Sequence, residues 1–266
     1  MEQGANGTAA IEMRGLHKAF GTKVVLDSID LTVHPGQVVG YIGPNGAGKT
    51  TTIRILTGLL DRFEGEGRVD GLDVRTSALD VKRRIGYVPE NAQLYDALSM
   101  EEHLQLVARL QGLPDDLGMH RARAIMGAFG LTARFRSRLG ALSKGQRQKV
   151  LIASALLHDP AVLFLDEPLS GLDVASTILI KTLIRELADR GCAVFYSSHM
   201  MDVVERICDR IVILNDGRIV ADGSYEELSA ARAGGSLESI FAELTGTGGE
   251  VSAVKSVIEA IKGTDA

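Results

Sequence analysis

A glycine-rich segment near the start of the chain has the residue types needed to bind phosphate. Residues 43–50 match the pattern G-x-x-x-x-G-K-[ST] and comprise Gly43, Pro44, Asn45, Gly46, Ala47, Gly48, Lys49 and Thr50. Glycines let backbone N–H groups turn inward around phosphate oxygens, and a helix that starts there adds a favourable dipole. Lys49 can neutralise phosphate charge, Thr50 can ligate Mg²⁺, and Thr51 is the next expected nucleotide-binding residue. The segment predicts nucleotide binding but does not distinguish a kinase, a GTPase and an ATPase.

A pair of carboxylates, Asp166 and Glu167, follows a short apolar run at 161–165. Such a run indicates a buried strand, and ligands of open α/β sheets bind where the strands end. Side chains alternate along a strand, so we expect the two carboxylates to point in different directions and to serve different roles. Asp166 would hold Mg²⁺ through its water shell, and Glu167 would act as general base on the attacking water. The structural alternative is a solvated Asp-Glu turn before Pro168.

The elements that position these residues alternate between strands and helices. Strands are expected at 11–20, 22–33, 37–42, 161–165, 193–197, 211–214 and 218–221, and helices at 49–59, 144–157, 175–189 and 200–206. Asn215-Asp216-Gly217 is typical of a hairpin turn. Buried strands that alternate with helices favour an α/β fold with a mainly parallel sheet, preceded here by an N-terminal antiparallel β subdomain.

The middle of the chain, about residues 92–142, is expected to be an inserted helical region. Ser99 and Glu102 form a capping box before apolar residues at helical spacing. Gly112, Pro114 and Gly118 are expected to separate this helix from the next, near 119–129.

Composition excludes several classes of protein. The chain has 266 residues, 45% of them hydrophobic, and its formal charge is 29 − 34 = −5. These values exclude wholesale disorder and do not suggest nucleic-acid binding. The apolar runs are too short for a membrane span, the first ten residues lack an apolar signal core, and Cys192 and Cys208 make no disulfide or metal framework.

Between the two chemical sites lies Leu142-Ser143-Lys144-Gly145-Gln146, which resembles the LSGGQ signature of the ATP-binding subunits of ABC transporters. Ser143 and Gln146 are also the two ends of a capping box, and the two interpretations are compatible. The resemblance implies that Ser143, Gly145 and Gln146 face the γ-phosphate of ATP held by a second subunit. It therefore implies a head-to-tail dimer with two ATP molecules at its interface.

Further residues extend the resemblance over about residues 10–230. Asp173, in Ser170-Gly171-Leu172-Asp173, matches the D-loop, which ties the two ATP sites together. His199 matches the switch histidine that contacts the γ-phosphate. Phe20 matches the aromatic residue that stacks on adenine, and its alternative is a core phenylalanine.

The sequence departs from the family pattern at two positions. Lys144 stands where glycine is commoner. Glu90, in Gly86-Tyr87-Val88-Pro89-Glu90, stands where the Q-loop glutamine is usual. Glu90 keeps an oxygen ligand for Mg²⁺ but adds negative charge near phosphate, and it resembles the residue of several exporter-type subunits.

The resemblance implies an ATPase, with ATP and Mg²⁺ as cofactors, that powers transport through a separate integral membrane permease. We expect it at the cytoplasmic face of the membrane, and we expect export rather than import. The alternatives are a soluble ABC-type ATPase acting on DNA, ribosomes or cofactor assembly, and a small-molecule kinase. The kinase would not explain residues 142–146 or His199.

The expected organisation is a flexible N-terminus at 1–9, an ATP-binding domain at 10–230 whose helical subdomain spans about 92–145, and a C-terminal helical tail at 231–266 with a linker at 245–249. In the tail, Val251, Val254, Ile258 and Ile261 share one helical face, which either docks on its own domain, frays or binds a partner. Basic groups at 82–84 and at Arg134, Arg136 and Arg138 are either solvated faces or contacts to the permease or anionic lipid.

Overall fold

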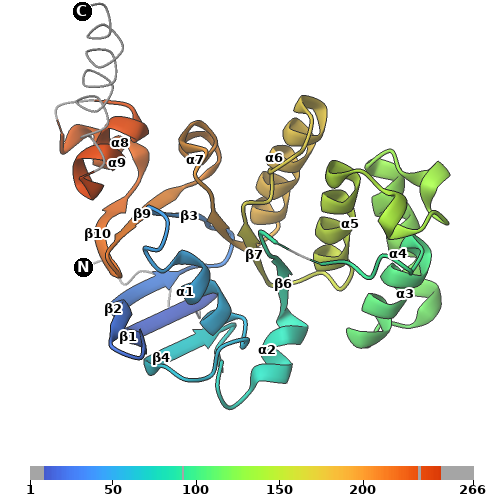
Figure 1. Cartoon of the computed structure of the whole chain (residues 1–266), viewed down its shortest axis with the longest axis horizontal. Helices are drawn as coiled ribbons and strands as arrows, with labels where there is room; N and C mark the ends of the chain where they lie inside the picture. The colour runs from blue at the N-terminus through green and yellow to red at the C-terminus, as the bar shows by residue number, and fades with distance from the viewer. Residues whose placement is uncertain (1–8, 92, 233–234, 247–266) are drawn as a thin grey trace, which may run out of the picture.

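A computed structural model describes residues 9–91, 93–232 and 235–246. The chain forms two β-sheets with helices packed around them (Figure 1). The strands are β1 (Ile11–Phe20), β2 (Lys23–Val33), β3 (Val38–Ile42), β4 (Glu64–Val69), β5 (Leu72–Asp73), β6 (Ile85–Val88), β7 (Val162–Asp166), β8 (Ala193–Ser197), β9 (Arg210–Asn215) and β10 (Arg218–Gly223). The helices are α1 (Lys49–Leu56), α2 (Ala78–Arg84), α3 (Met100–Leu110), α4 (Asp115–Ala128), α5 (Lys144–Leu156), α6 (Val174–Asp189), α7 (Met201–Ile207), α8 (Tyr225–Ala230) and α9 (Leu237–Thr245), with 3₁₀ turns at Thr132–Arg134 and Leu139–Ala141.

The larger sheet has the strand order β10-β9-β3-β8-β7-β6. Neighbouring strands from β9 to β6 are parallel, and β10 runs antiparallel to β9 after a turn in which Asp216 and Gly217 both have positive φ. Every residue of β3, β7 and β8 is buried, as expected for parallel strands covered on both faces. The predicted mixed α/β fold with a mainly parallel sheet is confirmed.

The smaller sheet is antiparallel, in the order β2-β1-β4-β5. Strands β1 and β2 form a hairpin in which Phe20 pairs with Lys23. The expected N-terminal hairpin is therefore present, but β1 also pairs with β4, which the sequence analysis did not anticipate.

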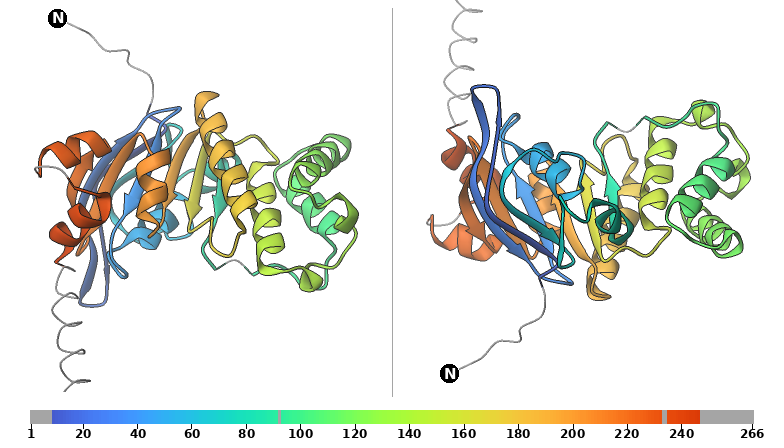
Figure 2. Two further views of the ribbon diagram at one scale, coloured as in Figure 1. Left: turned by 90° about the horizontal axis from the view of Figure 1, so that it is seen from above. Right: turned by 90° about the horizontal axis from the view of Figure 1, so that it is seen from below.

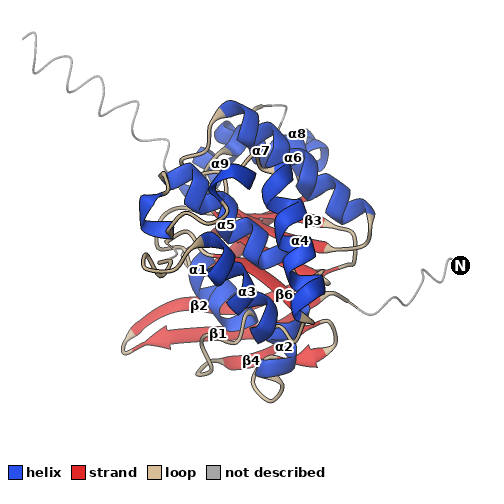
Figure 3. Cartoon of the chain, turned by 90° about the vertical axis from the view of Figure 1, so that its right-hand side faces the viewer, coloured by secondary structure: helices blue, strands red, loops and turns tan. Residues whose placement is uncertain are grey.

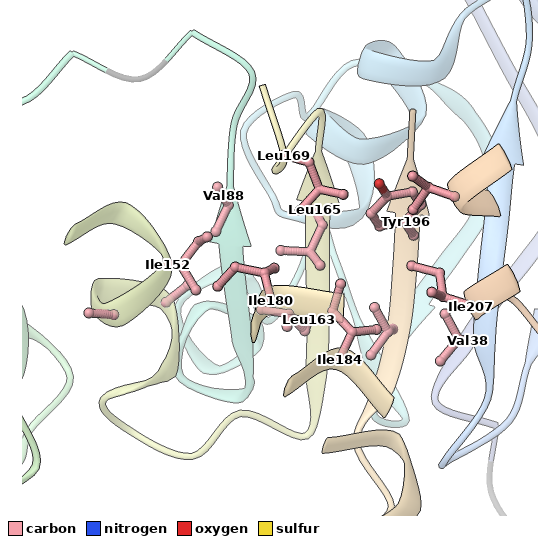
Figure 4. Packing of buried hydrophobic residues seen from close by; sticks show 14 of the residues in the cluster. Val38, Val88, Ile152, Leu163, Leu165, Leu169, Ile180, Ile184, Tyr196 and Ile207 are labelled. Carbon is pink, nitrogen blue, oxygen red and sulfur yellow. The ribbon is translucent and has the colours of Figure 1, made fainter. Parts of the chain in front are cut away.

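The larger sheet is covered on both faces by different layers. On one face, Leu163, Leu165 and Tyr196 belong to a hydrophobic cluster with Ile180 and Ile184 of α6, as Figure 4 shows. Views from above and below place α6 and α7 on one side and α1 with the small sheet on the other (Figure 2).

The opposite face of the sheet carries three aromatic side chains, Tyr41, Phe164 and Phe195, beside aliphatic ones. Tyr41 and Phe195 have ring centroids 4.8 Å apart, and Phe164 lies 5.7 Å from Phe195. These rings join α1 and the small sheet in the second hydrophobic cluster. Successive strand residues point to opposite faces of the sheet. This packing therefore fixes which side chains of the sheet face α1.

Helices α3, α4 and α5 pack together at one end of the molecule (Figure 3). The predicted capping box of Ser99 and Glu102 starts α3. The expectation that Gly118 breaks the chain between helices was wrong, because Gly118 lies inside α4. A Cβ built there would lie 2.6 Å from the Cβ of Ala108, so this glycine allows α3 and α4 to approach closely.

Several other expectations about elements need correction. The helix expected at 49–59 ends at Leu56, and β4, β5, α2, β6 and α8 were not predicted. The expected stripe at 251–261, most of the linker at 245–249, and residues 1–8 lie outside the described residues. None of the helices in the described part of the chain combines the length and apolar character that a bilayer-spanning helix requires.

Candidate functional site

A cavity of about 700 Å³ lies at the carboxyl edge of the parallel sheet, where β3, β7 and β8 end. It is lined by Lys23, Val25, Asn45, Gly46, Gly48, Lys49, Thr50, Thr51, Glu90, Asp166, Glu167 and His199. The loop before α1 and the carboxylates of Asp166 and Glu167, at the end of β7, therefore share one cavity.

The start of α1 is shaped to receive an anion. Its N-cap is Gly48, with φ 114°, and no side chain of the described residues caps the helix. The N–H groups of the first turn are therefore available to phosphate oxygens. A Cβ at position 48 would lie 2.6 Å from Leu26 Cδ2 and 2.8 Å from the Val25 carbonyl oxygen, so only glycine fits.

Lys49 is held by the loop that precedes it. Its Nζ donates to the carbonyl oxygens of Gly43, at 2.6 Å, and Pro44, at 3.1 Å. Burial lowers the pKa of Lys49, and the charges of Glu167 and Asp166 oppose this shift. An ammonium group held by neutral carbonyl oxygens can turn toward a phosphate without breaking an ion pair.

Thr50 and Asp166 come from different elements and meet in the cavity. The Thr50 hydroxyl donates to Asp166 Oδ2 at 3.1 Å. Burial raises the pKa of Asp166, and the hydrogen bond from Thr50 acts in the opposite direction. With Glu90 on the same cavity wall, these residues offer the hydroxyl and carboxylate oxygens that Mg²⁺ prefers.

Glu167 has an unusual backbone conformation and two side-chain partners. Its φ is 51°, which is uncommon for a residue other than glycine, and its N–H donates to the Ser197 carbonyl oxygen at 2.9 Å. Oε1 lies 2.8 Å from His199 Nδ1, and Oε2 accepts a hydrogen bond from Ser198 Oγ at 3.0 Å. A nearly buried carboxylate held in this way can accept a proton from water in the cavity.

Asp166 and Glu167 differ in their partners, as expected, but both line the same cavity. The left-handed backbone of Glu167 interrupts the strand alternation on which the expected divergence rested.

Sequence reasoning missed three residues of the site. Ser198 binds Glu167 and also accepts from the Met200 N–H, and its place directly before His199 could have drawn attention to it. Lys23 and Val25 line the cavity from β2. No local motif marks these two residues, because only the packing of the β1–β2 hairpin brings them to the site.

Other predicted residues lie outside the cavity lining. Phe20 is 51% exposed, with Lys18 Nζ 4.6 Å from its ring centroid. Ser143 and Gln146 form the capping box of α5, and Asp173 caps α6 by accepting from the Ser176 N–H at 2.7 Å. The predicted residues Gly43, Pro44, Ala47 and Gly145 also lie outside the lining. Of these, Gly43 and Pro44 bind Lys49 through their carbonyl groups.

Comparison with known proteins identifies the family. Residues 26–170 match the family described as ABC transporter. The chain is 37% identical over 220 residues to the ABC transporter ATP-binding protein NatA of Bacillus subtilis, covering 82% of this chain and 89% of NatA. It is also 37% identical over 224 residues to the daunorubicin/doxorubicin resistance ATP-binding protein DrrA of Streptomyces peucetius, covering 84% and 68% of the two chains.

A solved structure shares the fold. The structure of the ATP binding subunit of an ABC transporter superposes with a TM-score of 0.84 at 32% identity, covering 88% of this chain and 99% of that one. The fold, the loop at 43–50 and these relatives agree. The chain therefore belongs to the ABC transporter family and is an ATP-binding subunit that hydrolyses ATP to power transport through a membrane permease.

Proposed function

We propose that this chain powers the export of a compound from the cell, acting at the cytoplasmic face of the membrane on a separate permease. Relatives in Bacillus subtilis and Cupriavidus metallidurans are named for linearmycin resistance and for Nod factor export, at 34% and 35% identity. DrrA is named for daunorubicin/doxorubicin resistance. Removal of a compound from the cell accounts for both the resistance names and the export name. The export expected from Glu90 agrees with this proposal.

The cavity that joins residues 45–46 and 48–51 to Glu167 and His199 is the observation that carries the hydrolytic role. Backbone N–H groups at the start of α1 bind the phosphates, and Lys49 turns from the Gly43 and Pro44 carbonyl oxygens to the β- and γ-phosphates. Glu167 orients the attacking water and accepts its proton as general base. His199 fixes the Glu167 carboxylate and contacts the γ-phosphate.

Thr50, Asp166 and Glu90 would hold Mg²⁺, which supplies positive charge against the phosphate oxygens when it is bound. The raised pKa of Asp166 supports this assignment, because a buried carboxylate is stabilised in its charged form by a nearby cation. Phe20, on the exposed tip of the β1–β2 hairpin, stacks on adenine.

Two copies of the chain form a head-to-tail dimer around two ATP molecules. The signature residues Ser143, Gly145 and Gln146 and the D-loop residue Asp173 lie outside the cavity lining of their own chain. They are therefore available to the nucleotide of a second copy, and Asp173 ties the two sites together. The α5 N-terminus supplies the N–H groups for that contact.

The experiment that tests export compares cells with and without the gene. Cells that lack the chain should retain more of at least one labelled compound from a panel that includes daunorubicin. The wild-type gene should restore efflux, and the Glu167→Gln variant should not. If the deletion strain instead takes up less of a panel compound than the wild type, the chain powers import. Failure of the chain to co-purify with a polytopic membrane protein from detergent extracts would favour the soluble ABC-type ATPase.

A further inference from the structure

Helix α5 begins with a lysine in an unfavourable place. Lys144 is its first helical residue, and the capping box of Ser143 and Gln146 already satisfies N–H groups there. A cation at a helix N-terminus is disfavoured by the partial positive charge of that end. The stability of α5 therefore gives no reason for Lys144.

The Lys144 side chain reaches from α5 across to the segment that follows Glu167. Its Nζ donates to Ser170 Oγ at 3.2 Å. A Cβ built on Gly171 would lie 2.9 Å from Cδ and 3.0 Å from Cε of Lys144, and the φ of Gly171 is 76°. The glycine therefore leaves the space that the lysine stem occupies.

Two further contacts join the same helix to the same segment. Gln148 is buried and donates from Nε2 to the Pro168 carbonyl oxygen at 2.9 Å. A Cβ on Gly145 would lie 2.9 Å from the Gly171 carbonyl oxygen, so the two backbones pack closely. Lys144 and Gln148 are four residues apart and share one face of α5.

The segment held in this way carries the proposed base. It runs from Glu167 to Gly171, and the Ser170 N–H donates to the Glu167 carbonyl oxygen at 3.2 Å. Displacement of Ser170 would therefore disturb the left-handed turn at Glu167 that aims its carboxylate at His199.

Of the two side-chain links, the one from Lys144 is the more easily broken. Lys144 is exposed, and its partner is a neutral hydroxyl group. Lys144 takes part in none of the ion pairs between the described residues. The Gln148 link, by contrast, is buried, and it holds the start of the segment.

We propose that Lys144 is a positioning residue for hydrolysis, whose ammonium group holds Ser170 and so keeps Glu167 in place relative to the N-terminus of α5. The inference rests on the proposed function, in which Glu167 is the base. It explains why a lysine stands where the family more often has glycine: this chain gains a direct side-chain link between its signature and its D-loop.

The test is a double-mutant cycle on steady-state ATP hydrolysis by the full chain with its permease. Lys144→Met keeps the stem over Gly171 but removes the donor, and Ser170→Ala removes the acceptor. Each should lower kcat by about three- to tenfold, the range of one hydrogen bond, with KM for ATP unchanged. The double variant should be no slower than either single variant, and Lys144→Arg should recover part of the loss.

Three outcomes would overturn the proposal: an unchanged kcat in Lys144→Met, losses that multiply in the double variant, or a change confined to KM. The control is Lys181→Met, which removes the same charge from α6 and should leave kcat unchanged.

Melting temperatures separate folding from positioning, because loss of a cation from the N-terminus of α5 should not destabilise the chain. If the wild type and Lys181→Met both lack ATPase activity, the proposed function fails. If both are active and Glu167→Gln is inactive, an unchanged kcat in Lys144→Met overturns only this inference and leaves the proposed function standing.

Discussion

Glu167 Oε1 and His199 Nδ1 lie 2.8 Å apart, although one side chain is nearly buried and the other is exposed. The two residues follow neighbouring parallel strands, β7 and β8, and the Glu167 N–H is bonded to the Ser197 carbonyl oxygen. The contact is thus a product of strand register, and it orients the proposed base.

Replacement of His199 should slow hydrolysis without weakening ATP binding. In His199→Ala, Glu167 keeps Ser198 as its partner but loses the imidazole that fixes its other oxygen. We expect kcat to fall by about 10²-fold or more, with a small change in KM. His120→Ala, on the exposed side of α4, is the matched control and should be neutral. Wild-type turnover by His199→Ala would remove this residue from the mechanism.

The raised pKa of Asp166 predicts a pH-dependent effect on stability. Its pKa in the folded chain lies above 3.8, the ordinary value for an aspartate, because the carboxyl group is buried. Ionisation is therefore harder in the folded state, and this residue lowers stability progressively as pH rises from about 3.8 through the folded pKa. Asp166→Asn, measured without Mg²⁺, should raise the free energy of unfolding at pH 7 and have little effect well below pH 3.8.

The measurement is urea unfolding of both proteins across this pH range, with and without MgATP. Added MgATP should stabilise the wild type more than Asp166→Asn, because the variant lacks the carboxylate proposed to hold Mg²⁺. An Asp166→Asn variant that is less stable than the wild type at neutral pH without Mg²⁺ would contradict the account.

The parts of the fold that could be predicted from sequence were those with strong local signals. The capping boxes at Ser99 and Ser143 and the hairpin turn at Asp216-Gly217 form as expected, because their hydrogen bonds lie within a few residues. Strand β4 was missed because Glu64–Val69 is rich in glycine and charge and is stabilised by pairing with β1. Gly118 was misinterpreted because its role depends on Ala108 of another helix.

The same distinction applies to the site. The loop at 43–50 and the carboxylates at 166–167 are contiguous motifs, and they were found. Ser198 and Lys23 enter the cavity through tertiary packing. The left-handed backbone at Glu167, which brings its side chain into the cavity with Asp166, has no local sequence signal.

The close approach of α3 and α4 should be sensitive to volume at position 118. Gly118→Ala places a methyl group 2.6 Å from Ala108 Cβ and should cost about 1–3 kcal/mol in the free energy of unfolding. Ala108→Gly in the same chain should recover part of that loss. Gly127→Ala is the control on α4: its nearest contact is Thr132 Oγ1 at 3.6 Å, so gained helix propensity should make it neutral or stabilising. Equal stability of the two alanine variants would contradict this packing.

Glu90 should contribute to turnover and to its stimulation by the permease. It lines the same cavity as Asp166 and follows β6, the last strand before the helical region. Glu90→Ala should lower the ATPase rate by about tenfold or more and reduce the stimulation, because an oxygen ligand is lost. Glu90→Gln should retain activity. If Glu90→Ala hydrolyses ATP and responds to the permease like the wild type, Glu90 has no role in coupling.

The central claim is that Glu167 is the base of an ATPase that closes as a dimer, and Glu167→Gln with ATP tests it most directly. The amide keeps the size of the side chain but cannot accept the proton of water. The account predicts retained ATP binding, a loss of turnover of about 10²- to 10⁴-fold, and an ATP-dependent dimer in size-exclusion chromatography. Hydrolysis by Glu167→Gln at near wild-type rate would contradict the account.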